Sequence, residues 1–218
     1  KIQIWDYLIH NIHNTAMIQV DAAKPAGREA KWIAGLQMVR QDAVGEGGNQ
    51  DVAKAYVRPG NKAMSLGART GWQNKQWDLS INYTRITDHG RYLFPREWGR
   101  DPFFTFLPRE RNEGFGDLHA MTAKVQYSFR DLPLQLSLAG GYFDLPDVKN
   151  TRLNKYGMPS YAQANLDIRY RFQGFFKGMD AQFLVVAKSA LGETYEQPRF
   201  IINKVNMVLY NLVLNYRF

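Results

Sequence analysis

The feature that most constrains the fold of this chain is a strict alternation of apolar and polar residues. Between residues 77 and 84, one face carries Trp77, Leu79, Ile81 and Tyr83, and polar side chains occupy the other face. Successive side chains of a β-strand point to opposite sides, so this pattern predicts a strand with one apolar and one polar face. Helical periodicity is scarce along the chain, which therefore predicts an all-β protein.

The same alternation recurs along the sequence and predicts about ten strands of roughly 10–13 residues. Clear examples lie at 118–130, 132–142 and 161–172, and weaker ones at 16–22, 32–38, 64–72, 179–188 and 208–218. The first strand, near 2–9, has no clear facing. Such lengths exceed the ~5–6 residues usual in soluble strands and match the ~9–11 residues of a tilted strand that crosses a membrane.

Connections between the expected strands alternate between short and long. Short ones lie at 24–28, 74–75, 130–133 and 173–178, and long ones at 43–61, 88–117, 145–160 and 191–203. An antiparallel up-and-down barrel with short turns at one end has this order, apart from a tight first hairpin near His10. We therefore expect a single domain, residues 1–218, that forms a transmembrane β-barrel with its last strand running towards the periplasm.

Composition favours a membrane barrel over its alternatives. The mean hydropathy is −0.42 and no run of ~18 apolar residues exists, so membrane helices are excluded. Polar residues such as Asp78, Asn82 and Lys124 fall in mid-strand, where a dry core would penalise each unpaired group by several kcal/mol. A water-filled lumen removes that penalty. A soluble sandwich of two sheets is the alternative.

The charge and the cysteine count narrow the range of partners. The chain has 28 lysines and arginines against 20 acidic residues, and its formal charge of +8 is spread along its length. Nucleic-acid surfaces cluster their charge, so we expect anionic solutes as partners and no nucleic acid. Without cysteine, the chain has no disulfide, no thiolate metal site and no cysteine nucleophile. It begins inside an expected strand, which indicates a mature or truncated segment with any signal peptide upstream.

Two segments resemble a known family. The longest expected loop contains Phe-Pro-Arg-Glu-Trp-Gly-Arg-Asp-Pro-Phe-Phe at 94–104, followed by Thr-Phe-Leu-Pro-Arg-Glu-Arg-Asn-Glu-Gly at 105–114. This sequence resembles the corresponding segment of the OprD family of outer-membrane porins. The end of the chain, Asn-Leu-Val-Leu-Asn-Tyr-Arg-Phe at 211–218, is similar to the last strand of such barrels. The similarity in the order of strands and loops extends over most of the chain.

The resemblance implies a fold, a location and a partner. Members of that family form eighteen-stranded monomeric barrels about twice as long as this chain, which would supply the C-terminal ten strands. The chain is then a fragment, or part of a longer protein, or it pairs with a partner that supplies the other strands. The expected location is the outer membrane of a Gram-negative bacterium, with several passes through its lipid. In such proteins a terminal aromatic residue, here Phe218, is read by the barrel-assembly machinery.

Inward-facing cations are the candidate substrate path. By the alternation they include Arg69, Lys124, Arg169, Arg171 and Lys188. Members of the family that this chain resembles use a ladder of basic side chains to guide carboxylate-bearing solutes, because successive cations lower the barrier without holding the solute. For Arg171, near the periplasmic end, a role at the rim is the stronger expectation. The alternative for the ladder is that its members brace the wall by pairing with Asp78, Asp167 and Asp180.

The loop at 88–117 is the second candidate. It holds five arginines and six acidic residues, so we expect it to be ordered and largely self-paired. Its aromatic residues need burial, and structureless loops of this length are usually functional or disordered. We expect it to fold towards the lumen and help form a constriction, and an extracellular cap is the alternative. The arginines expected at the constriction are Arg96, Arg100, Arg109 and Arg111.

Signals for an enzyme or a metal site are weak. The four histidines lack metal-ligand spacing, and no serine lies in a nucleophile-elbow motif. Asp88 beside His89 is a single adjacent pair of the kind that barrel proteases use. We therefore expect no catalytic residue, no metal and no cofactor, and interpret the chain as a porin for passive diffusion of small carboxylate-bearing solutes. The alternatives are a structural barrel that supports other envelope proteins and, less favoured, an outer-membrane barrel hydrolase.

Overall fold

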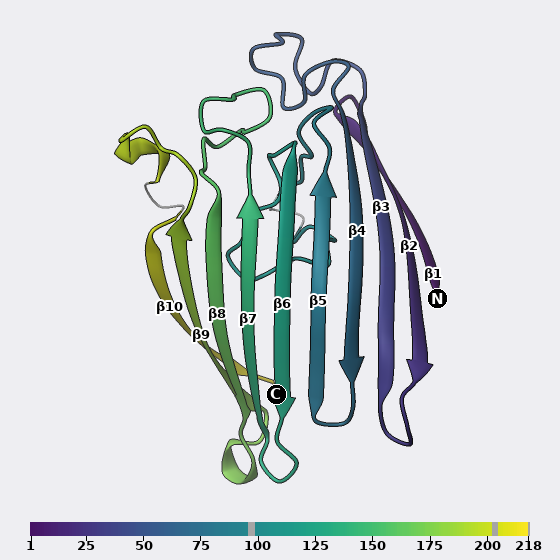
Figure 1. Cartoon of the computed structure of the whole chain (residues 1–218), viewed down its shortest axis with the longest axis vertical. Coiled ribbons are helices and arrows are strands. Elements are labelled where there is room, and N and C mark those ends of the chain that lie inside the picture. Colours follow the sequence, from purple (N-terminus) through teal and green to yellow (C-terminus); the bar gives the residue numbers. More distant parts are fainter. Residues whose placement is uncertain (96–98, 202–204, 218) are drawn as a thin grey trace.

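The structure is a computed structural model and describes residues 1–95, 99–201 and 205–217. In these ranges ten strands form one antiparallel sheet in sequence order (Figure 1). The strands are β1 (Ile2–Ile9), β2 (His13–Pro25), β3 (Lys31–Ala43), β4 (Lys62–Gln73), β5 (Trp77–Ile86), β6 (Leu118–Ser128), β7 (Leu134–Asp144), β8 (Tyr161–Arg171), β9 (Met179–Ala190) and β10 (Met207–Tyr216). The predicted all-β, up-and-down arrangement is confirmed. No helix in the described part of the chain is long and apolar enough to cross a membrane.

The sheet is curved and does not close. β2 to β9 have hydrogen-bonded neighbours on both sides, whereas β1 and β10 each have one neighbour within the described ranges. Figure 1 shows the long links 44–61, 145–160 and 191–201 gathered at one end and the short turns at the other. The tight first hairpin, closed by a bond from the Ile12 N–H to the Ile9 carbonyl, joins the long-link end. The ten strands therefore form part of a barrel wall.

The two faces of the wall differ in polarity, as the alternation predicts. Asn82 of β5 lies opposite Arg69 of β4 and Thr122 of β6, so polar side chains share one face across three strands. We call this the inner face, because the loop at 88–117 covers it. The outer face carries side chains such as Ile81 and Leu138, which are 58% and 59% exposed. Exposed apolar residues along every strand are typical of a surface that contacts lipid.

The structure also gives the facing of β1, which the sequence left open. Gln3 lies opposite Gln19 of β2, and its amide donates to the Asp21 carboxylate on the inner face at 3.3 Å. Trp5 and Tyr7 follow at a spacing of two and line a cavity on the same face. The division into two faces thus continues to the first edge of the sheet.

The hydrophobic core lies on the inner face near the long-link end, between the wall and the loop at 88–117. Its buried members include Ile86, Leu118, Phe143 and Tyr161 from the wall and Tyr92, Phe103, Leu107 and Phe115 from the loop. The rings of Phe143 and Tyr161 stack with their centroids 4.6 Å apart. The wall therefore packs against its own loop and not against a second sheet, so the soluble sandwich is the wrong alternative.

A charge on the outer face of β7 should lower the stability of the protein more than the same charge on its inner face. We expect Leu138→Arg, which puts a guanidinium on the outer face in mid-strand, to destabilise the protein in lipid vesicles by about 2–4 kcal/mol. Ser137→Arg puts the same charge one residue away on the inner face, and we expect a change below ~1 kcal/mol. Denaturant unfolding in vesicles, followed by tryptophan fluorescence, measures both. Equal losses would contradict the assignment of the two faces.

Candidate functional site

The loop at 88–117 joins β5 to β6 and lies against the inner face. Gln41 of β3 makes two hydrogen bonds with Leu93, donating to its carbonyl at 2.8 Å and accepting from its N–H at 2.9 Å. Gln37, on the same strand and face, donates to the carbonyl of Pro102 at 3.0 Å. β3 thus holds the loop at two separate points.

The far part of the loop reaches β8 and β9. Gln163 and Asn165 of β8 both donate to the carbonyl of Pro108, at 2.8 and 3.0 Å. Lys188 of β9 donates through Nζ to the carbonyl of Arg109. These contacts carry the loop across the inner face from β3 to β9.

A buried polar cluster also orders the loop. Glu113 is 4% exposed and accepts a hydrogen bond from the hydroxyl of Tyr156, which lies in the link between β7 and β8. Arg111 lies over the Tyr156 ring at 4.1 Å and within 3.8 Å of the Glu113 carboxylate. Burial raises the pKa of the Tyr156 hydroxyl, and its hydrogen bond to Glu113 raises that pKa further. The hydroxyl therefore stays protonated and able to donate at physiological pH.

The loop's charges pair both inside the loop and with the wall. Among the described residues, Arg111 and Glu113 form an arginine–carboxylate pair inside the loop. Asp117 instead pairs with Arg85 of β5 at 2.6 Å. Wall side chains also hold the loop by donating hydrogen bonds to its main-chain carbonyls. A count of charged residues does not reveal these bonds.

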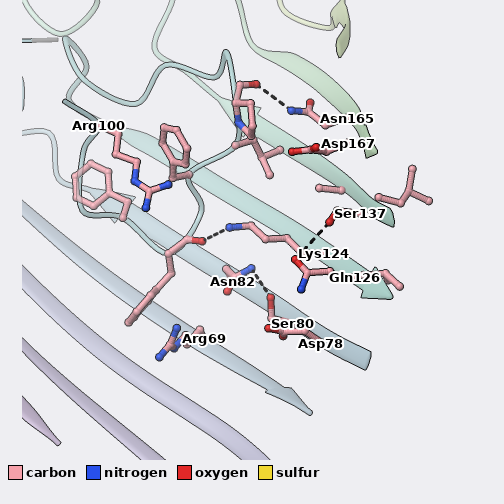
Figure 2. A pocket seen from close by; sticks show the side chains of 18 of the residues that line it. Arg69, Asp78, Ser80, Asn82, Arg100, Lys124, Gln126, Ser137, Asn165 and Asp167 are labelled. Carbon is pink, nitrogen blue, oxygen red and sulfur yellow. Dashed lines mark hydrogen bonds between the residues drawn. The ribbon is translucent and has the colours of Figure 1, made fainter. Parts of the chain in front are cut away.

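A cavity of about 590 Å³ lies under the loop (Figure 2). Its wall side includes the polar residues Ser80, Asn82, Gln126, Ser137 and Asp167, and its loop side includes Arg100, Asp101, Phe104 and Phe106. Figure 2 shows Lys124 reaching from the wall to a loop carbonyl, with Arg69 and Arg100 on either side of that contact. A volume of this size accommodates a small organic solute.

All five predicted path residues face inward, but acids neutralise two of the arginines. Arg69 of β4 pairs with Asp21 of β2 at 2.7 Å. Arg169 of β8 pairs with Asp167 of the same strand at 3.0 Å. Bracing of the wall by such pairs was the alternative interpretation, although Asp21 was not among the acids expected. Arg171 is exposed near the short-turn end.

The two lysines of the predicted path hold the loop. Lys124 of β6 donates through Nζ to the carbonyl of Phe104 at 2.9 Å, as Lys188 does to Arg109. Lys188 is only 7% exposed. Loop carbonyls replace water as the partners of these buried donors and remove the penalty of burial.

Three of the four arginines predicted at the constriction can be placed, and Arg96 lies outside the described residues. Arg100 is exposed, lies over the Phe106 ring at 5.2 Å and lines the cavity. With the carboxylates that the structure describes, Arg100 forms no ion pair. Arg109 is also exposed, whereas Arg111 belongs to the cluster around Tyr156. Arg100 is therefore the loop cation that a solute in the cavity can reach.

Sequence reasoning missed the uncharged and acidic side chains that fix the loop and its neighbours. They are Asp21, Gln37, Gln41, Gln163 and Asn165. The alternation places these residues at polar positions, but nothing local distinguishes a side chain that meets a loop carbonyl from one that meets water.

In the described ranges, no three residues of the types His, Cys, Asp and Glu are grouped as metal ligands would be. The Asp88 and His89 side chains, 3.9 Å apart, are 67% and 71% exposed. His89 contacts the Thr87 hydroxyl at 3.0 Å.

Comparison with known proteins addresses the fold. No protein-family model and no curated protein sequence matches the chain. Among solved structures, OccK2 (OpdF) of Pseudomonas aeruginosa in complex with glucuronate is similar with a TM-score of 0.73 and 11% identity, over 98% of this chain and 52% of that one. OpdK of the same species with vanillate has a TM-score of 0.70 and 10% identity, over 98% and 51%. OccAB4 of Acinetobacter baumannii has a TM-score of 0.71 and 13% identity, over 99% and 48%.

The chain thus spans about half the length of the solved structures that it resembles. The likeness shows the fold: ten antiparallel strands that match part of the barrel of OprD-type outer-membrane porins. The fold that the sequence resemblance implied is confirmed.

The cluster around Tyr156 generates a test of how the loop is ordered. We expect Tyr156→Phe to lower the free energy of unfolding by about 1–3 kcal/mol, because the buried Glu113 carboxylate loses a hydrogen-bond donor. Tyr195→Phe is the matched control, since that hydroxyl donates to Asp147 at an exposed site in the outer loops, and the change should be smaller. Denaturant unfolding in lipid vesicles measures both variants. Similar losses of unfolding free energy in the two variants would contradict the idea that burial of Glu113 strengthens the effect of its hydrogen bond to Tyr156.

Proposed function

We propose that the protein is an outer-membrane channel through which small carboxylate-bearing solutes diffuse, and that this chain supplies part of its wall and its constriction. The observation that carries the proposal is the loop at 88–117, which crosses the inner face and leaves the Arg100 guanidinium exposed over a polar cavity. A narrowed lumen with an accessible cation serves passage of anions and has no evident use in a barrel that acts only as a scaffold.

The chemistry of the cavity favours carboxylates. A guanidinium presents parallel N–H donors that match the two oxygens of a carboxylate, and the Phe106 ring beneath Arg100 helps to orient it. Hydroxyl and amide groups from Ser80, Gln126 and Ser137 offer donors and acceptors to the rest of a polar solute. A single cation in contact with water binds weakly enough to release its ligand. Glucuronate and vanillate, present in two of the similar structures, both carry a carboxylate.

The same proposal places the protein in the outer membrane of a Gram-negative bacterium. The support is the apolar outer face of the strands together with the fold shared with outer-membrane porins. Lipid would then contact side chains such as Ile81 and Leu138. Phe218, outside the described residues, would be the aromatic residue that the barrel-assembly machinery reads. Passage of solutes is passive and uses no cofactor.

Recordings in planar lipid bilayers test the channel directly. We expect the purified protein to give single-channel current steps that glucuronate partly blocks and that glucose at the same concentration does not. Absence of conductance would refute the channel, and equal effects of the two sugars would refute the preference for carboxylates.

Arg100→Gln tests the residue on which the preference depends. We expect the flux of glucuronate into liposomes to fall at least about threefold, corresponding to ~0.7 kcal/mol at the constriction, while the flux of glucose stays nearly constant. The physical reason is that Gln keeps the polarity and most of the size but loses the charge and the paired donors. Arg58→Gln, in the exposed link between β3 and β4, is the matched control and should change neither flux. A parallel fall in both fluxes would indicate a change of aperture and contradict a selective role.

A further inference from the structure

The Phe104 ring packs against the wall where two strand residues are glycines. Its side chain is 9% exposed, although it projects from a loop. A Cβ added to Gly35 of β3 would lie 2.9 Å from the Phe104 ring, and one added to Gly67 of β4 would lie 3.5 Å from it. A glycine inside a strand weakens the strand and often marks a place where another group approaches the backbone closely. Neighbouring strands thus leave room for this ring.

Arg69 lies over the ring and is itself held in place. Its guanidinium carbon is 4.7 Å from the centre of the Phe104 ring, and one of its nitrogens is 2.7 Å from the Asp21 carboxylate. Gln19 donates to the same carboxylate at 2.8 Å. The orientation of Arg69 is therefore fixed by β2, and its charge is largely balanced by Asp21.

Lys124 holds the same residue by its main chain. From β6, its Nζ donates to the Phe104 carbonyl at 2.9 Å (Figure 2). The ring of Phe104 is thus held from β3 and β4, and its carbonyl from β6. Arg100 precedes this point by four residues, so the place of its guanidinium over the cavity depends on how firmly Phe104 is seated.

We propose that Arg69 and Lys124 are positioning residues that hold Phe104 against the wall and thereby set the width of the opening. They are then not members of a basic ladder to which a passing anion binds (rungs). The inference rests on the proposed channel function and assigns these two cations a different task within it. A rung must exchange its partner for the solute, whereas Arg69 has a fixed carboxylate partner and Lys124 a fixed carbonyl. Loss of either contact loosens the loop around Phe104 and enlarges the opening, while Arg100 keeps its charge.

Two variants separate the alternatives. Lys124→Met keeps the approximate length of the side chain but removes the hydrogen-bond donor. Arg69→Lys keeps the charge but removes the planar guanidinium that lies over the Phe104 ring and pairs with Asp21. For each variant we expect trypsin to cleave the folded protein in vesicles about tenfold faster after Arg100 or Arg109. A tenfold increase corresponds to lowering the free energy of releasing the loop from the wall by ~1.4 kcal/mol. We also expect higher conductance and more open-channel noise. Lys54→Met and Arg58→Lys, in the exposed link between β3 and β4, are the controls and should match the parent protein.

A different pattern of results would overturn the proposal. If Lys124→Met leaves cleavage and noise unchanged but shifts the reversal potential towards cations, and Arg69→Lys has no effect, both residues are rungs and the inference is wrong. Protease cleavage does not require conductance, so it tests the seating of Phe104 even if the channel proposal fails. If Lys124→Met does not fold, Arg69→Lys decides the question, because a rung tolerates an exchange of one cation for another.

Discussion

Every carbonyl that the loop at 88–117 brings against the wall needs a donor, and this requirement determines how loop and wall fit together. A buried carbonyl without a partner costs about 1–3 kcal/mol, so a loop can lie on the inner face only where side chains meet its main chain. β3, β6, β8 and β9 provide such donors through Gln37, Lys124, Asn165 and Lys188. Because the donors are spread across the sheet, the loop cannot shift without losing several bonds at once. The loop is therefore held against the wall from β3 to β9.

The fold was largely predictable because its signal is local. Alternation along a strand and turn residues at its ends are properties of neighbouring residues, so the strands, their order and their two faces follow from the sequence. Errors remain at the boundaries: β7 spans Leu134–Asp144, whereas the pattern indicated 132–142. The facing of β1 was not predictable, because Trp5 and Tyr7 place aromatic rings on the inner face and blur the alternation.

The candidate site was predictable only in the facing of its residues. Alternation placed Arg69 and Lys124 on the inner face correctly, but it does not reveal whether a cation meets a solute, an acid or a carbonyl. Those partners are distant in sequence, as with Lys124 and Phe104 or Arg69 and Asp21, and they depend on the path of the loop. Gly35 and Gly67 could have given a hint, since glycine inside a strand indicates close approach by another group.

The distribution of partners changes what the net charge of +8 means for selectivity. Asp21 and Asp167 balance Arg69 and Arg169, so these pairs contribute little field beyond about one Debye length, ~8 Å at physiological salt. An unpaired cation near a protein surface interacts with an anion more strongly than one in open water, by about 4 against 1 kcal/mol at 4 Å. Arg100 meets that condition through its place on the loop and the aromatic ring beside it. In the proposed channel, selectivity would depend on where the loop holds Arg100, which makes the seating of the loop as important as the charge it carries.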